Sequence, residues 1–513
     1  MGQPSDVNSS ELDSRAQDSR LIARQGVASF LGSATSAIMG FILIVVLART
    51  LGDVGSGVVL QAIAVFTIVL SLARAGMDSA AVWIMPRLVA HDPVQIRSAL
   101  GTMFFVTALS SSVCAIATAL LAPGFALGGD SHSDEVVRAV TVAGWFLPAG
   151  ALLLVTLAVT RGLGGIVPYM GVGSVGLPVV RSIVVWLAAT AGGSFVAVTL
   201  AWAAPLPVAL IAVLIIVRFQ IRRHERAADV SGSWRPIAPL RQSILRYALP
   251  RTVSAGLEQT LIWLDVIMVG VIAGSAAAGV YGGASRFVAA GLVIDTALRI
   301  VVSTRFSTLL FEKKLVEVEA LYRVAATLLV LFGTPIYLLL AVFAPLVLSW
   351  LGPGFEQGST ALVILCVGAT LAFTAGNIHS VLLMSGRSGW AAINKGVVLL
   401  VNVAGNLVLI PLIGITGAAL SWAFCMLLDA TLAMIEVRRF LGIRMGVGTI
   451  AYALLVPVVT FGAPAITLRL TIGDTLLALV LAAAVGTILF VGWCALDRKR
   501  LHLHDLRIIT RRR

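Results

Sequence analysis

The sequence has few charged residues and long stretches without any. Only 12% of its 513 residues are Asp, Glu, Lys or Arg, whereas 59% are hydrophobic. A water-soluble domain of this length would lack enough polar surface with such a composition. A β-barrel would alternate apolar and polar residues, whereas here apolar runs extend for about 20 residues. The composition therefore predicts an all-α polytopic membrane protein.

Several chemical motifs are also missing. The sequence contains no GxxxxGK[ST] phosphate-binding loop and no HExxH or GxSxG hydrolase pattern. The four cysteines lie far apart in apolar segments without a CxxC pair, so we expect no disulfide and no bound metal. We also expect no cofactor and no enzymatic activity. A membrane glycosyltransferase or polymerase would need a larger external loop than the stretch 122–135 provides.

Fourteen apolar stretches are long enough to cross a bilayer, which takes about 20 apolar residues. The longest polar interruption falls between the sixth and seventh stretches and divides the first twelve into two sets of six. The predicted organisation is a disordered cytoplasmic tail (1–23), a six-helix bundle (24–217), a cytoplasmic linker (218–243), a second six-helix bundle (244–440), two further helices (441–496) and a basic cytoplasmic tail (497–513).

The net charge of +13 is distributed unevenly between the loops. If the N-terminus faces the cytoplasm, 30 of the 37 basic residues lie in cytoplasmic segments, and only Arg49, Arg138 and Arg469 lie at outer ends. Cytoplasmic loops of membrane proteins are enriched in Lys and Arg. We therefore expect both termini in the cytoplasm, contact with anionic membrane lipids, and no nucleic-acid partner.

Four arginines lie inside predicted spans: Arg74, Arg181, Arg286 and Arg299. A charge at this depth is costly and normally faces a bundle interior or a wet cavity. The planar guanidinium can donate two hydrogen bonds to a phosphate, so four arginines in a cavity would suit a pyrophosphate. Arg181 and Arg286 have no acidic residue one helical turn away, which favours the cavity interpretation for them.

The other two arginines have an acidic neighbour at i,i+4 spacing. Arg74 precedes Asp78, and Asp295 precedes Arg299. Residues at this spacing share a helix face and can form an ion pair. For Arg74 and Arg299 a purely structural role is therefore as well supported as substrate binding.

Acidic residues in spans are candidates for binding a coupling ion, H⁺ or Na⁺. Glu258 and Asp265 lie seven residues apart on one face of the seventh span, and Asp429 lies in the twelfth. The alternative is an ion pair across the cavity with an arginine or with Lys395. Polar groups in the tenth and eleventh spans, namely His379, Asn377, Asn402 and Asn406, are expected mainly to form hydrogen bonds between helices.

A weak internal repeat relates the two predicted bundles. Aligning SGVV (56–59) with AGVY (278–281) gives an offset of 222 residues. The charged pair Arg74 and Asp78 then falls within one position of Asp295 and Arg299, with the order of charges reversed. Structural repeats around a central site are common in transporters.

Four motifs resemble those of bacterial polysaccharide and lipid-linked oligosaccharide flippases. They are VVLARTLGDVGSGVVLQAIAVF (45–66), VTRGLGG (159–165), IWLDVIMVGVIAGSAAAGVYGGASRF (262–287) and NLVLIPLIGITGAALSWA (406–423). Their order and spacing are similar to those of the multidrug/oligosaccharidyl-lipid/polysaccharide (MOP) flippase superfamily. The resemblance spans residues of about 40–440 and includes Asp265 in an "LD…G" pattern.

This resemblance implies a pair of pseudo-symmetric bundles arranged as an inverted V, with a cavity that opens alternately to each side of the bacterial cytoplasmic membrane. It implies a polyprenyl-(pyro)phosphate-linked saccharide as substrate, for cell-envelope polysaccharide biosynthesis, with polysaccharide-assembly proteins as candidate partners. A lipid II flippase and a cation-coupled multidrug exporter are alternatives within the superfamily. Four buried arginines argue against the exporter. A membrane glycosyltransferase or a non-transporting scaffold is an alternative of another class.

Overall fold

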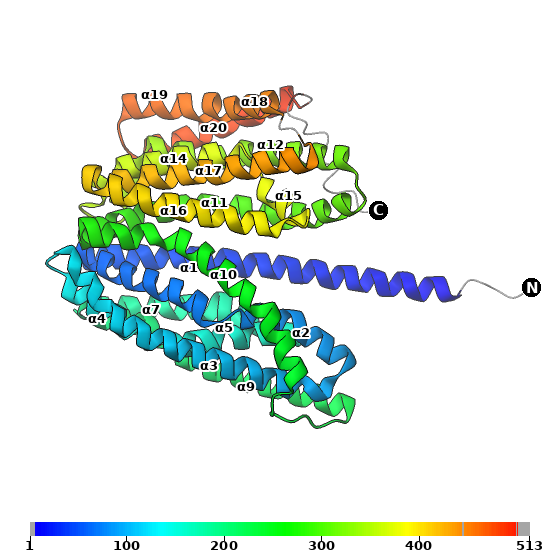
Figure 1. Ribbon diagram of the computed structural model, residues 1–513. Helices are drawn as coiled ribbons and strands as arrows, with labels where there is room; N and C mark the ends of the chain where they lie inside the picture. The colour runs from blue at the N-terminus through cyan, green and yellow to red at the C-terminus, as the bar shows by residue number, and fades with distance from the viewer. Residues whose placement is uncertain (1–5, 444–445, 499, 501–513) are drawn as a thin grey trace, which may run out of the picture.

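The computed structural model describes residues 6–443, 446–498 and 500, which form helices and connecting turns without a β-strand. Figure 1 shows the helices gathered into two bundles, with a smaller C-terminal group beside the second. The predicted all-α membrane fold is therefore confirmed.

The first bundle contains the helices α1 (Asp6–Ala73), α2 (Met77–His91), α3 (Ile96–Leu121), α4 (Ser133–Gly144), α5 (Leu147–Gly162), α6 (Ile166–Pro168), α7 (Leu177–Thr190), α8 (Phe195–Ala203) and α9 (Pro205–Ala228). The second contains α10 (Ala238–Ala273), α11 (Ser275–Phe311), α12 (Leu315–Val342), α13 (Ala344–Ser349), α14 (Ser359–Phe373), α15 (Ile378–Met384), α16 (Ser388–Ile413) and α17 (Ile415–Leu441). The last group is α18 (Val447–Pro457), α19 (Ala463–Ile472) and α20 (Leu476–Leu496).

Within the described residues, 12 helices are individually long and apolar enough to cross a membrane. The helices α4 and α5 form one further span bent by 44°. Helix α1 contains two of the predicted spans, because Gly52 interrupts it with φ 70° and ψ −168°. Glycine adopts this conformation at little steric cost. Counted in this way, the spans agree with the fourteen predicted from hydrophobicity.

Two predicted boundaries are wrong. Residues 6–23, expected to be a disordered tail, belong to helix α1, which begins at Asp6. The stretch 6–25 contains no glycine or proline, so the backbone meets no strong helix breaker there. The linker expected at 218–243 is also mostly helical, and only 229–237 connects α9 to α10. Most of the predicted basic tail, 497–513, lies outside the described residues.

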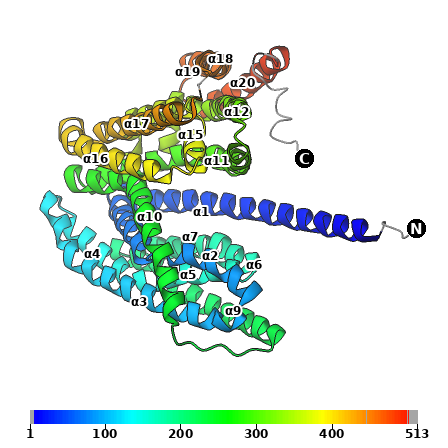
Figure 2. The same ribbon diagram turned by 45° about the vertical axis from the view of Figure 1, so that its right-hand side comes forward.

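Helix α10 passes from one bundle to the other (Figures 1 and 2). Near its start, the ring of Tyr247 stacks on Trp83 of α2, with ring centres 4.5 Å apart. Nearer its end, Asp265 accepts a hydrogen bond from Asn406 of α16. Pro250 lies between these contacts. A proline inside a helix removes a backbone hydrogen bond and permits bending, so α10 has the form of a hinge between the bundles.

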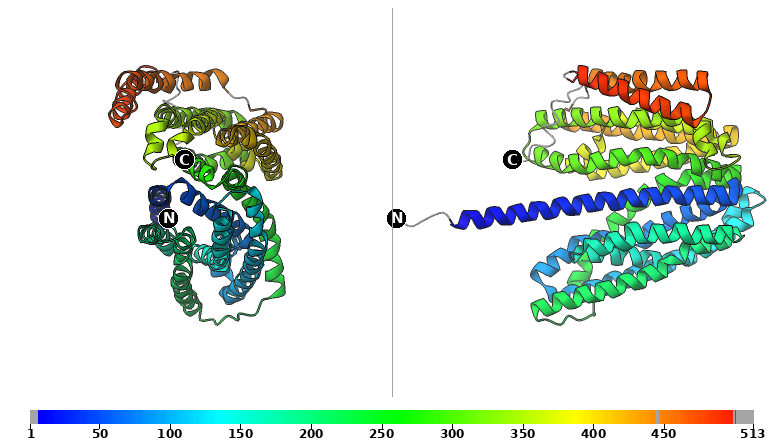
Figure 3. Two further views of the ribbon diagram at one scale, coloured as in Figure 1. Left: turned by 90° about the vertical axis from the view of Figure 1, so that its left-hand side faces the viewer. Right: turned by 180° about the vertical axis from the view of Figure 1, so that it is seen from behind.

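The two ends of the molecule differ in how the bundles meet (Figure 3). One end carries the break in α1 at Gly52 and the approach of Gly274 to the turn 129–132, and we call it the Gly52 end. The other carries the connection 229–237, and we call it the linker end. The ribbons of the two bundles approach at the Gly52 end and diverge toward the linker end.

The closest approach at the Gly52 end joins the two halves of the internal repeat. A Cβ atom at Gly57 would lie 1.7 Å from the carbonyl oxygen of Ser275. A Cβ atom at Gly279 would lie 2.0 Å from the carbonyl oxygen of Asp53. With the offset of 222, Gly57 corresponds to Gly279 and Asp53 to Ser275, so the contact is reciprocal, as in a symmetric dimer.

We predict that Gly57→Ala and Gly279→Ala each destabilise this closed end by about 1–3 kcal/mol, the usual cost of overpacking. Gly40→Ala is the matched control, because a Cβ atom there would meet nothing within 4 Å and the higher helix propensity of alanine should stabilise slightly. Thermal unfolding of the purified protein measures both effects. Equal melting temperatures for Gly57→Ala and Gly40→Ala would contradict the close packing.

Candidate functional site

Arg286 and Arg181 are half-buried intramembrane arginines, and neither has a carboxylate partner in the described part of the chain. Arg286 on α11 lies over the indole of Trp263 on α10, with its guanidinium carbon 3.7 Å from the ring centre. Arg181 on α7 lies over Trp202 of α8 at 4.1 Å. An aromatic face attracts a cation without neutralising it. Both side chains therefore keep their charge available for an anion.

The remaining donors of these arginines have few protein acceptors. Arg181 Nε donates to the carbonyl oxygen of Trp202 at 3.1 Å. Arg286 Nε is buried and has no acceptor among the described residues. The two arginines belong to different bundles, and no described contact joins them. The sequence identified both residues, whereas the stacking on Trp263 and Trp202 was missed because each tryptophan lies on a neighbouring helix.

Arg74 forms the ion pair that the i,i+4 spacing predicts. Its Nη1 atom lies 2.7 Å from Oδ2 of Asp78, and both side chains are mostly buried. The pair spans the break between α1 and α2, where Ala75 and Gly76 have φ 47° and 67°. Arg74 thus binds α1 to α2, and the structural alternative is favoured for this residue.

The corresponding pair in the second bundle, Asp295 and Arg299, makes no ion pair in the described chain. Arg299 is exposed on α11. Asn377 lies beside them, and with its amide nitrogen toward Asp295 it donates to Asp295 Oδ1 at 3.2 Å and accepts from the Arg299 backbone N–H at 3.2 Å. Asn377 thus contacts one oxygen of the Asp295 carboxylate, and no ion pair of the Arg299 guanidinium lies within the described residues.

Asp265 is 3% exposed and has no basic partner in the described residues. Its Oδ1 accepts from Asn406 Nδ2 at 2.7 Å, and its Oδ2 accepts from the Tyr281 hydroxyl at 3.2 Å. Asn406 Nδ2 also donates to Asn402 Oδ1 at 3.2 Å. The interhelical role expected for the two asparagines is therefore present, and their partner is the carboxylate.

This arrangement gathers oxygen atoms around a buried negative charge. The Asn406 Oδ1 atom is buried and has no donor in the described chain. A buried carboxylate normally requires a counter-charge or a proton. Among the described residues Asp265 pairs neither with an arginine nor with Lys395, which contacts Asp429 instead. Carbonyl and carboxylate oxygens are ligands that hard cations prefer.

Lys395 of α16 and His379 of α15 both contact Asp429 of α17. Lys395 Nζ lies 2.5 Å from Asp429 Oδ2, and His379 Nε2 lies 3.3 Å from the same oxygen. The other oxygen, Asp429 Oδ1, is buried without a partner in the described chain. For Asp429 the structure therefore favours an ion pair, with Lys395 as the partner, over the binding of a coupling ion. Glu258, the remaining candidate, is exposed on α10.

Lys395→Met should reduce the free energy of unfolding by about 2 kcal/mol, because Asp429 would remain buried without its lysine. This is less than the roughly 3–5 kcal/mol of a fully buried pair, since the Lys395 side chain is 32% exposed. The double variant Lys395→Met, Asp429→Asn should be more stable than Lys395→Met alone. Thermal unfolding followed by tryptophan fluorescence tests this, and strictly additive losses would contradict the pairing.

Comparisons with known proteins agree with this architecture. A sequence model of the family described as "Polysaccharide biosynthesis protein" matches residues 22–302. No curated protein sequence matches the chain at a significant level.

Two solved structures have similar folds. One is described as "Lipid II flippase MurJ, inward closed conformation", with a TM-score of 0.73, 13% identity, and coverage of 93% of this chain and 99% of that one. The other is an inward-facing multidrug resistance MATE family transporter of the MOP superfamily, with a TM-score of 0.63, 15% identity, and coverage of 79% of this chain and 94% of that one. At these identities the likeness establishes the fold.

Proposed function

Because the chain belongs to the polysaccharide biosynthesis protein family of the MOP flippase superfamily, we propose that it translocates a polyprenyl-(pyro)phosphate-linked saccharide across the bacterial cytoplasmic membrane. The proposed mechanism is alternating access, in which no covalent bond of the substrate is made or broken. The product would be used in cell-envelope polysaccharide biosynthesis, with polysaccharide-assembly proteins as partners.

The observation that carries this proposal is a pair of intramembrane arginines that no carboxylate of the described residues neutralises. Arg286 and Arg181 lie in apolar helices and are stacked on Trp263 and Trp202. A buried cation is expensive unless a function retains it. A pyrophosphate would supply the missing negative charge and accept the free N–H groups. Arg299, exposed and unpaired, is a further candidate contact, whereas Arg74 is occupied by Asp78.

The arrangement of the bundles supports a direction for the conformational change. Basic residues gather in segments at the linker end, which we propose to be cytoplasmic. The Gly52 end, which holds the reciprocal glycine contact, would then face outward. In the proposed cycle the substrate head group enters from the linker end, and bending at Pro250 of α10 opens the Gly52 end.

Arg286→Ala and Arg181→Ala should each reduce flipping at least about tenfold, because a hydrogen bond to a charged group contributes about 1.5–3 kcal/mol. Flipping is measured with a fluorescent polyprenyl-pyrophosphate oligosaccharide in proteoliposomes. The matched control is Arg87→Ala, which also removes an arginine stacked on a tryptophan, at 4.5 Å from the Trp83 ring centre, but at an exposed position.

Unchanged flipping by both Arg286→Ala and Arg181→Ala would exclude the pyrophosphate role. Lipid II carries the same pyrophosphate chemistry, so a parallel assay with lipid II distinguishes the two substrates. Preferential transport of lipid II by the unmodified protein would exclude polysaccharide export while leaving the arginine site intact.

We also propose that Asp265 binds the coupling ion, H⁺ or Na⁺. Its carboxylate is buried with two asparagine side chains and a tyrosine hydroxyl, and no basic group of the described chain neutralises it. A cation bound there would contact helices α10 and α16. Binding could therefore alter how α10, which links the bundles, packs against the second bundle.

Asp265→Asn should abolish the response of flipping to an imposed Na⁺ or pH gradient, because the amide cannot carry the charge that either ion neutralises. The control is Asp134→Asn, which changes an exposed carboxylate in the first turn of α4. Proteoliposomes with one gradient at a time identify the ion. If Asp265→Asn retains the response of the unmodified protein, the coupling site lies elsewhere.

A further inference from the structure

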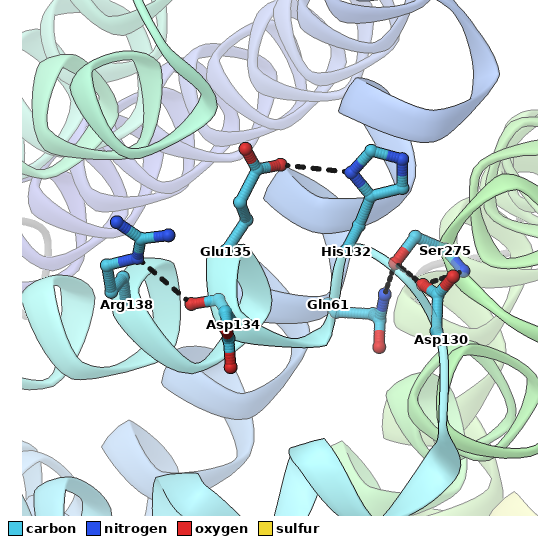
Figure 4. A network of polar contacts seen from close by, with 7 residues as sticks. All are labelled: Gln61, Asp130, His132, Asp134, Glu135, Arg138 and Ser275. Carbon is cyan, nitrogen blue, oxygen red and sulfur yellow. Dashed lines mark hydrogen bonds and ion pairs between the residues drawn. The ribbon is translucent and has the colours of Figure 1, made fainter.

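The bundles are joined at the Gly52 end by a hydrogen-bonded contact that the proposed function does not use (Figure 4). Asp130 lies in the turn before α4, in the first bundle. Its Oδ2 atom accepts a hydrogen bond from the Ser275 backbone N–H at 2.9 Å and another from the Ser275 hydroxyl at 2.6 Å. Ser275 is the first residue of α11, in the second bundle.

Asp130 acts as the N-terminal cap of a helix in the opposite bundle. The first N–H groups of an α-helix have no partner within the helix. The residue before α11 is Gly274, which has no side chain to cap it. The carboxylate of Asp130 supplies the acceptor and also interacts favourably with the positive end of the helix dipole.

The Ser275 side of the contact is buried, whereas Asp130 itself is only partly buried. Ser275 is 1% exposed. Its hydroxyl is also approached by Gln61 of α1, whose Nε2 donates to it at 3.4 Å. If Asp130 withdrew while the end stayed closed, the Ser275 N–H would remain buried without its acceptor, which costs about 1–3 kcal/mol. The cap and the close approach of the bundles therefore depend on each other.

We propose that Asp130 is a gate residue that holds the Gly52 end closed by capping α11 across the interface between the bundles. This inference rests on the proposed alternating-access function. Asp130 and Ser275 lie on different bundles, and these bundles must separate for the Gly52 end to open. The contact therefore belongs to the closed state and is broken in the open state. Asp130 thus sets the balance between the two states without touching substrate.

The charge on Asp130 is maintained at working pH. Burial raises its pKa, but the hydrogen bonds from the Ser275 hydroxyl and backbone, a backbone hydrogen bond involving His132 and the charge of His132 outweigh this effect, so the pKa is lowered overall. Ser275 of α11 and Gln61 of α1, which face Asp130 from the packed helices, are uncharged. In its own segment, His132 is paired with Glu135 at 3.3 Å, and Arg138 contacts the Asp134 carbonyl oxygen.

The direction of the pH effect follows from that lowered pKa. The contact is at full strength above the ordinary aspartate pKa of about 3.9 and is lost as the pH falls through the lower value of the closed state. Acid should therefore open the Gly52 end only below about pH 4. Between pH 5 and 8 the gate should not respond to pH through Asp130.

The experiment measures distances between spin labels in the full-length protein in nanodiscs, with the native cysteines replaced. Gly124→Cys with Gln357→Cys reports on the Gly52 end, and Ala228→Cys with Phe311→Cys reports on the linker end. In the Asp130→Ala variant, which removes the acceptor for the Ser275 N–H and hydroxyl, the long-distance population at the Gly52 end should rise about tenfold, and the linker-end pair should shorten. Ser275→Ala, which keeps the backbone N–H, should give a smaller shift.

Asp134→Asn is the control, because it removes a neighbouring exposed carboxylate and should leave both distances unchanged. Loss of a merely structural cap would not shorten the linker-end pair. Unchanged distances in Asp130→Ala, or an acid-induced opening that persists in it, would overturn the proposal. The measurement needs no substrate, so a gate that opens as expected in a protein that does not flip the saccharide would reject only the proposed function.

Discussion

The structure depends on a contact in which two backbones approach without intervening side chains. Gly57 faces the carbonyl oxygen of Ser275, and Gly279 faces that of Asp53. Any Cβ atom at either glycine would separate the bundles. Because the two halves of the repeat make the same contact with each other, closure at this end is symmetric. The diverging helices and the hinge in α10 follow from closing one end and leaving the other apart.

Charged side chains in the membrane-spanning region have two kinds of surroundings. Arg74 and Lys395 bind carboxylates, namely Asp78 and Asp429. Arg286 and Asp265 have no partner of opposite charge in the described chain. Arg286 lies over a tryptophan ring, and Asp265 accepts hydrogen bonds from neutral donors. The first kind connects helices. In the proposed function, the second kind provides one site for the lipid pyrophosphate and one for the coupling ion.

The gate at Asp130 connects these features. It lies beside the reciprocal glycine contact and joins the first turn of α11 to the opposite bundle. The same helix carries Arg286, and the neighbouring α10 carries Asp265. Movement of α11 away from Asp130 would therefore be coupled to the surroundings of both sites through continuous helices. Rigid helices with two discrete packings are the physical means of such coupling.

The sequence by itself determined the spans, the division into two bundles, the repeat with its offset of 222 and the local pair Arg74–Asp78, because hydrophobic runs and i,i+4 spacing report on neighbours along one helix. It failed for residues 6–23, where helix propensity prevailed over polar composition. It also could not choose partners between helices. Asp265 and Asn406 are 141 residues apart, and Asp130 and Ser275 are 145 apart. Only the tertiary structure decided these pairs, because helix packing and not sequence spacing brings such groups together.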